Sequence, residues 1–263
     1  YYNRFSIFWS CYRLSAQPFC TTGDYYIIIV RSFRIAGNEF ESSLALDASI
    51  RENTTVTVAV ETPSRGTEVE LLESICKSAR KHSLTDFRLF NRKARDFGVE
   101  GNEGFFRDVI KTNRKYITGY HHVIHGNETN HEVESVHSAL LLDSLLDPYE
   151  DRLVIVDGGE QKARPVVNSL SGLRDAIPSV THCLKSEYYY PQCLLADLSA
   201  FYVSCLVNEN EYNHLDPFFD APSAEHTEEL CGKAFAGMKQ SKPEYRVLDL
   251  LEKIGDSPRE RAK

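Results

Sequence analysis

The sequence predicts an α/β fold in which a mixed β-sheet is flanked by helices. Short runs of apolar and β-branched residues alternate along the chain with longer stretches whose apolar residues recur every three or four positions. Strand-like runs come first, and helices and strands then alternate, an order that favours a helix-covered mixed sheet over a bundle or a sandwich. With 263 residues, 42% of them hydrophobic, the chain can bury one large core.

The first elements are read as strands. Residues 25–30 form a compact apolar run, typical of a buried strand. Residues 40–48 are also largely apolar, and residues 54–61 alternate β-branched residues with small or polar ones. Because Asn53 between the last two runs suits a turn, they are predicted to form a hairpin.

The same criteria predict the remaining elements in chain order. Helices are expected over residues 67–82, 104–113, 130–146, 161–177, 193–207 and 245–254. Strands are expected over residues 116–124, 152–157 and 180–185. Pro165 must then lie in the first turn of its helix, where a missing N–H costs nothing.

We expect one α/β domain over residues 36–207, preceded by an extension or extra strand over 1–35 and followed by an acidic extension with one helix over 208–263. The longest strongly apolar run has six residues, far short of the roughly 20 that cross a bilayer as a helix. Seven cysteines without a C-x-x-C pair indicate neither a disulfide framework nor a zinc site. A reducing, cytoplasmic setting is therefore expected.

The charge distribution predicts that any contact with nucleic acid is local. The net charge of −8 argues against a protein that coats nucleic acid with its whole surface, but residues 77–115 contain eleven Lys or Arg and five Asp or Glu. Five phenylalanines interleave with this basic region: Phe87, Phe90, Phe97, Phe105 and Phe106. They could stack on bases, with Arg92 and Lys93 as candidate substrate-binding residues, or form the core beneath a solvated basic face.

Three aspartates lie where a charge is expensive. Asp47 and Asp157 each end an apolar strand, and Asp197 interrupts a helix that is otherwise apolar on nearly every face. Singly, such residues cap turns or helix ends. Together they indicate a site, because a buried carboxylate must be paired or bound to metal. If the two strands are neighbours, the carboxylates converge and favour a hard cation such as Mg²⁺ or Mn²⁺.

These motifs resemble a known family. An early strand ending Asp-x-Ser, a middle strand ending in Asp and a late Ala-Asp-Leu-x-Ala helix after a Pro are similar to the ribonuclease-H-like family catalogued as domain of unknown function 3800, over residues 40–207. By motif, Asp47 and Ser49 match the first element, Asp157 the second and Asp197 the third, and Ser49 is taken as a candidate substrate-binding residue. The family pattern has Glu and Gly where this chain has Ala48 and Ile50. It also has Gln three residues before the helix Asp, where this chain has Leu194; Gln192 is out of register.

The resemblance implies a ribonuclease-H-like fold and a metal-dependent nuclease. Hydrolysis would use the three aspartates to hold two cations roughly 3.5–4 Å apart. Glu73 or Glu160 could provide a fourth ligand, and Lys185 could contact the scissile phosphate or simply be a solvated strand end. Asp24, ahead of another apolar run, could replace Asp47. The alternatives are a catalytically inactive module that binds nucleic acid or a protein partner, and a structural protein whose aspartates only cap turns.

A histidine cluster offers a rival site. Five histidines fall within 17 residues: His121, His122, His125, His131 and His137. A zinc or iron site is conceivable, and one histidine could shuttle protons near the aspartates. The other interpretation is a polar surface strand followed by a helix.

Overall fold

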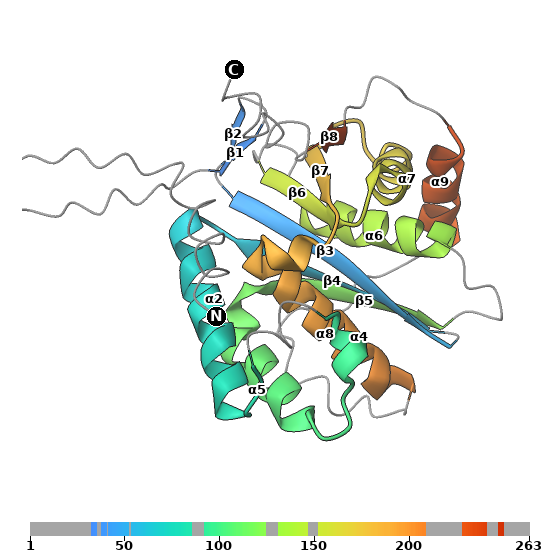
Figure 1. Cartoon of the computed structure of the whole chain (residues 1–263). Coiled ribbons are helices and arrows are strands. Elements are labelled where there is room, and N and C mark those ends of the chain that lie inside the picture. Colours follow the sequence, from blue (N-terminus) through green and yellow to red (C-terminus); the bar gives the residue numbers. More distant parts are fainter. Residues whose placement is uncertain are drawn as a thin grey trace, which may run out of the picture.

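The structure, a computed structural model, describes residues 33–35, 38–40, 42–52, 54–85, 92–124, 131–146, 152–208, 228–240 and 247–249. The expected strand over residues 25–30 and Asp24 lie outside the described residues, as does much of the expected extensions over 1–35 and 208–263. Within the described part, a six-stranded sheet has helices on both faces (Figure 1).

The sheet is mixed. Its strands lie in the order β5 (Ile117–Ile124), β4 (Thr54–Thr62), β3 (Ser42–Arg51), β6 (Arg152–Asp157), β7 (Ser179–Cys183) and β8 (Val247–Asp249). β4 is antiparallel to β3 and β5, whereas β3, β6, β7 and β8 run parallel. A separate antiparallel pair consists of β1 (Phe33–Ile35) and β2 (Asn38–Phe40).

Helices divide between the two faces of the sheet (Figure 1). One face carries α2 (Arg65–Lys81), α4 (Ala94–Phe97), α5 (Glu103–Asn113) and α8 (Pro191–Asn208). The other carries α6 (His131–Leu145), α7 (Glu160–Leu170) and α9 (Glu228–Met238). Two 3₁₀ turns, η1 (Arg114–Tyr116) and η2 (Ser186–Tyr188), complete the described elements.

Side-chain alternation along the strands divides the core between these faces. In β4, Val58 packs with α2, α5 and α8, while the next residue, Ala59, packs with α6 and α7. In β3, Leu46 likewise joins the α6–α7 cluster. Asp47, one position further, therefore faces the α8 side. Full burial of each Val or Leu stabilises the fold by about 1.5–3 kcal/mol.

The predicted fold class, a mixed α/β sheet flanked by helices, is confirmed. The hairpin predicted around Asn53 is the β3–β4 pair, and most other elements lie within a few residues of their expected ranges. Three expectations are wrong. α7 ends at Leu170 rather than residue 177. Pro165 lies inside α7, which begins at Glu160, and not in the first turn. Residues 247–249, expected to be helical, form β8, because pairing with β7 overrides local helical spacing.

Candidate active site

Two predicted aspartates lie side by side on neighbouring parallel strands. Asp157 ends β6 as expected, but β3 continues past Asp47 to Arg51, so the expectation that Asp47 ends its strand is wrong. Leu46 of β3 is in register with Val156 of β6, so Asp47 and Asp157 follow side by side at the same edge. This is the convergence expected from the sequence. Carboxyl ends of parallel strands are where ligand groups gather in such sheets.

The third aspartate reaches the same place from α8. Because α8 is apolar on all sides, it is buried against β3 and β4, and Asp197 is the only charged residue in its sequence. Asp47 and Asp197 share a hydrogen bond. Burial, followed by the charges of Asp157 and Asp197, raises the pKa of Asp47 well above its usual value. Burial also raises the pKa of Asp197, although Lys93 and the backbone N–H of Ala94 act against this.

Asp157 differs from Asp47 and Asp197 because both of its carboxylate oxygens accept hydrogen bonds from side chains. Its Oδ1 accepts hydrogen bonds from the backbone N–H (3.1 Å) and the hydroxyl (2.7 Å) of Ser186, and its Oδ2 accepts one from Lys93 Nζ at 2.7 Å. Burial alone raises the pKa of Asp157, but the Lys93 charge and these hydrogen bonds hold it below the usual value. Asp157 is therefore ionised at neutral pH.

A fourth carboxylate, Glu187 on η2, was missed by the sequence reasoning. Its Oε2 lies 3.0 Å from Lys93 Nζ, and its side chain is 2% exposed. Burial and then the charge of Asp157 raise the pKa of Glu187, against the effect of Lys93. The signal that could have found it is its place just after β7, the next parallel strand along from β6.

The carboxylates open onto a cavity of about 850 Å³. The three aspartates line it together with Ser49, a predicted substrate-binding residue, whose Oγ lies 3.0 Å from Ser204 Oγ. Four cationic side chains also line this space: Arg51, Lys93, Arg95 and Lys162. Of these, only Lys93 was a sequence candidate. The cavity thus brings carboxylates from β3, β6 and α8 together with four cationic side chains.

The donor set fits a hard divalent cation by chemistry and charge. Asp47, Asp157, Asp197 and Glu187 supply carboxylate oxygens, the ligands Mg²⁺ and Mn²⁺ prefer, against the single ammonium of Lys93. Lys162 adds little, because it pairs with Glu134 at 3.1 Å. Within the described ranges, however, no three His, Cys, Asp or Glu are arranged to hold a metal as they stand. Binding would require these carboxylates to exchange their present hydrogen bonds.

Other sequence candidates lie outside this cavity. Lys185 is exposed, with a left-handed backbone (φ 57°) and its Nζ 5.5 Å from the ring centre of Tyr188. Arg92 is exposed and does not line the cavity. Neither proposed fourth ligand is there: Glu73 is exposed on α2, and Glu160 pairs with Arg164. We attribute these misses to side-chain direction, which sequence spacing does not reveal.

Gln192, which the sequence analysis left without a role, is fully buried. Its Nε2 donates to Ser43 Oγ at 2.7 Å and to a carboxylate oxygen of Glu68. These contacts tie α8 to β3 and α2. Gln192 therefore helps to position the helix that carries Asp197 and does not line the cavity.

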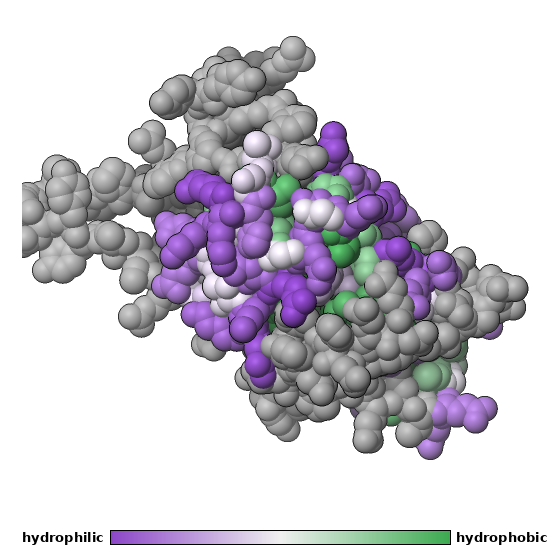
Figure 2. All heavy atoms as spheres, turned by 90° about the horizontal axis from the view of Figure 1, so that it is seen from below, coloured by the Kyte–Doolittle hydropathy of each residue, from purple (hydrophilic) through white to green (hydrophobic). Residues whose placement is uncertain are grey.

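Of the two interpretations of the interleaved phenylalanines, the structure supports the core beneath a basic face, and not base stacking, for those that it describes. Phe105 and Phe106 are fully buried in the core with α2 and α8, and Phe97 packs against them. Phe87 and Phe90 lie outside the described residues. The region is thus a solvated basic face above an aromatic core. Most of the residues coloured in the view from below are hydrophilic, with some apolar ones between them (Figure 2).

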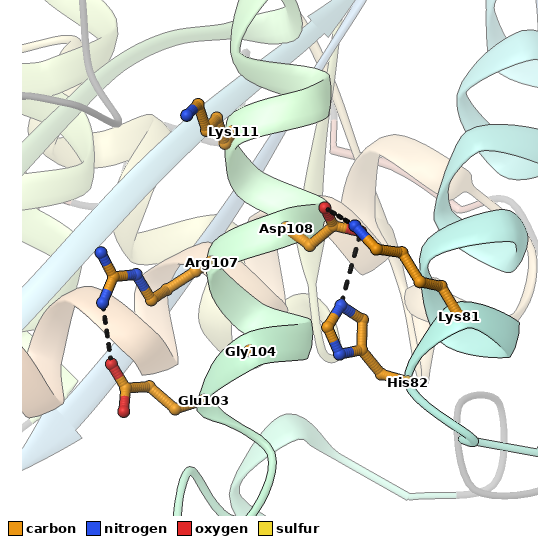
Figure 3. Close-up of a pocket in the computed structure, with 7 residues that line it drawn as sticks. All are labelled: Lys81, His82, Glu103, Gly104, Arg107, Asp108 and Lys111. Atoms are coloured by element: carbon orange, nitrogen blue, oxygen red, sulfur yellow. Dashed lines mark hydrogen bonds and ion pairs between the residues drawn. The ribbon is translucent and has the colours of Figure 1, made fainter.

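Part of that basic face forms a second, shallower pocket of about 490 Å³ between α2 and α5. Figure 3 shows Lys81 and His82 pointing toward Asp108, and Arg107 toward Glu103. The Lys81–Asp108 distance is 2.8 Å and the Arg107–Glu103 distance 3.2 Å. Two of the three Lys and Arg side chains that line this pocket are therefore paired with acids.

The histidines do not form the rival site within the residues described. His121 and His137 are buried and stacked, with ring centres 4.8 Å apart. Burial lowers the pKa of His122. His125 lies outside the described residues, as does the side chain of His131. None of the described histidines belongs to a group of three potential metal ligands.

Comparisons with known proteins found similarity at the level of structure only. No family model and no curated protein matches the chain. Ribonuclease H2 of Pyrococcus horikoshii OT3 is 12% identical over 76% of this chain and 100% of that one, with a TM-score of 0.43. A point mutant of Bst ribonuclease HIII is 13% identical over 76% and 71%, also with a TM-score of 0.43. Ribonuclease HII of Archaeoglobus fulgidus, solved in complex with PCNA, is 12% identical over 75% and 87%, with a TM-score of 0.39.

A likeness of this strength assigns no activity to the chain. Among the helices that the structure describes, none has the length and apolar character needed to cross a membrane.

Proposed function

We propose that this chain is a divalent-metal-dependent nuclease that hydrolyses phosphodiester bonds, with Asp47, Asp157 and Asp197 as its central acids. The observation that carries the proposal is their convergence from β3, β6 and α8 at one cavity. Their charge exceeds what Lys93 neutralises, and an uncompensated buried charge is costly. A divalent cation would supply the missing positive charge.

Phosphate is the substrate group that the rest of the cavity favours. Arg51 and Arg95 line it, and a guanidinium group binds phosphate oxygens in pairs. The net charge of −8 means that such contacts are confined to this region rather than spread over the surface. Nucleic acid is therefore the proposed substrate class.

In this proposal the residues of the site have separate roles. A bound divalent cation supplies an activated water and stabilises the leaving oxygen. Asp47 and Asp197 would hold that cation beside Asp157, which Ser186 orients, and Gln192 anchors the helix that carries Asp197. No side-chain nucleophile is needed.

The test is Asp157→Asn, assayed on DNA and RNA with Mg²⁺ or Mn²⁺. We expect cleavage to fall by more than the about 10–100-fold that loss of an outer-shell partner costs, while the protein stays folded. Asp175→Asn is the matched control, because Asp175 is exposed and outside the cavity, and it should cleave normally. Full cleavage by folded Asp157→Asn would disprove the proposal.

A second candidate is a catalytically silent module that binds nucleic acid or protein. It is favoured by the ammonium of Lys93, which already neutralises part of the charge on Asp157 and Glu187. Calorimetric titration with Mn²⁺ separates the two functions. Binding supports the nuclease, and the absence of binding supports the silent module.

A further inference from the structure

Lys93 is held in place by its backbone. It precedes α4, and its own N–H donates to Asp96 Oδ2 at 3.0 Å. The next residue, Ala94, is 1% exposed, and its N–H donates to Asp197 Oδ2 at 3.0 Å. One turn on, Phe97 stacks on Phe106 with ring centres 5.5 Å apart. The backbone that carries the Lys93 ammonium is therefore fixed by hydrogen bonds and by the packing of α4.

The ammonium divides the carboxylates into two pairs. Lys93 Nζ bridges Asp157 Oδ2 at 2.7 Å and Glu187 Oε2 at 3.0 Å. Asp47 and Asp197 form the other pair, which shares a hydrogen bond. Their remaining contacts with neighbouring backbone come from Ala48 N–H to Asp47 and from Ala94 N–H to Asp197. One pair is thus satisfied by a fixed cation, whereas no ion pair with a cation is found for the other among the residues that the structure describes.

We propose that Lys93 permanently occupies one of the two cation positions, so that the site binds a single divalent ion, between Asp47 and Asp197. This inference rests on the proposed nuclease function and deepens it. It differs from the two-cation arrangement that the sequence resemblance implies. Lys93 acts here as a positioning residue, a built-in positive charge on Asp157.

The contacts of Asp157 support the single ion. A second cation on Asp157 Oδ2 would need the volume that Lys93 Nζ fills, since both require contact with the same oxygen at under 3 Å. Asp157 Oδ1 is already used by Ser186. With Lys93 in place, both oxygens of Asp157 have partners in the protein, which leaves Asp47 and Asp197 as the carboxylates for the ion.

The experiment counts bound Mn²⁺ by calorimetry and by electron paramagnetic resonance in the full chain. The wild type should bind one ion, and Lys93→Ala should bind two, because the vacated position then accepts a metal. Arg95→Ala is the matched control: it removes a cation from the same cavity, but that side chain is 77% exposed and pairs with Asp96 rather than with one of the three site aspartates. It should still bind one ion.

The outcomes separate this inference from the function beneath it. Two ions in the wild type, one ion in folded Lys93→Ala, or two in Arg95→Ala would each overturn the inference while leaving the nuclease proposal standing. No Mn²⁺ in the wild type would overturn both. If Lys93→Ala fails to fold, the wild-type count still decides, together with Lys93→Gln, which keeps hydrogen bonding but removes the charge and should also admit the second ion.

Discussion

The carboxyl group of Asp47 is in an environment that opposes its charge. It lies next to Asp157 and Asp197, and its Oδ1 accepts a hydrogen bond from the N–H of Ala48 at 2.8 Å. A neutral amide would avoid the repulsion and could still donate to Asp197. Sites that bind cations commonly carry such a cost in the metal-free protein, since function and stability ask for different residues.

Asp47→Asn should therefore stabilise the metal-free protein and remove its response to metal. Each kcal/mol of relieved repulsion raises the melting temperature by roughly 2–4 °C in a protein of this size. Melting curves in chelator and in excess Mn²⁺ test both effects. Wild type should gain stability with Mn²⁺ and Asp47→Asn should not. A lower melting temperature for Asp47→Asn in chelator would contradict the charge argument, and Asp175→Asn should match the wild type in both conditions.

Asp108, in the pocket between α2 and α5, shows the opposite effect: its surroundings favour the charged carboxylate and lower its pKa. The hydrogen bond from Lys81 is the main cause that lowers the pKa of Asp108, with help from Ser78 and the charge of His82. A carboxyl group whose pKa is lower in the folded state stabilises the protein above its ordinary pKa of about 3.9. That contribution is lost as pH falls through the lower folded value.

The melting-temperature gap between wild type and Asp108→Asn should accordingly be widest near neutral pH and narrow as pH falls below the usual carboxyl range. Lys81→Gln should narrow the same gap at neutral pH, because it removes the main partner of Asp108. Thermal melts across this pH range provide the measurement. A gap that stays constant as pH falls would show that Asp108 acts through packing rather than charge.

At the scale of elements, α7 and α9 approach closely because glycines lie between them. A Cβ built on Gly237 would lie 2.6 Å from the carbonyl oxygen of Asn168 and 2.7 Å from the N of Gly172. These neighbours are backbone atoms, which cannot swing aside. By contrast, a Cβ on Gly232, on the same helix, would meet nothing within 4 Å.

Two substitutions on α9 should therefore change stability in opposite directions. Gly237→Ala should destabilise the protein by about 1–3 kcal/mol through overpacking. Gly232→Ala should stabilise it by roughly 0.5–1 kcal/mol, because alanine loses less entropy than glycine in a helix. Denaturant unfolding measures both. Equal effects would mean that helix propensity alone governs α9 and that its approach to α7 is loose.

At the scale of the whole molecule, the predicted C-terminal extension contributes to the same fold. β8 pairs with β7 at the edge of the sheet, and α9 packs on α6 and α7. Ala234 is fully buried with Val136 and Leu140 of α6. A domain boundary at residue 207 stays a prediction. These contacts indicate that residues after 207 help to stabilise the domain that precedes them.

Truncation after Asn208 tests that boundary. Removing α9 and β8 uncovers the apolar surface of α6 and α7, so we expect a lower melting temperature and increased binding of a hydrophobic dye. Dye fluorescence and thermal melts of the truncated and full chains provide the comparison. Unchanged values would place the boundary at residue 207, as the sequence predicts.

The sequence by itself determined the fold class, most element ranges and the three aspartates, because these depend on local patterns. The periodicity of apolar residues predicts which face of a strand or helix is buried, and Asp47, Asp157 and Asp197 are conspicuous where that pattern is broken. Parallel pairing of β3 and β6 then makes two of them neighbours.

Only the tertiary structure decided which other charged side chains lie beside the three aspartates. Lys93 and Glu187 are 94 residues apart, yet one ammonium bridges Glu187 and Asp157. Glu73 and Glu160 have the same chemistry as Glu187 but point elsewhere. The edge strand β8 likewise replaced an expected helix. Such choices depend on long-range packing and side-chain direction, which no local pattern records, and so the cation that neutralises a buried acid is known only once the chain is folded.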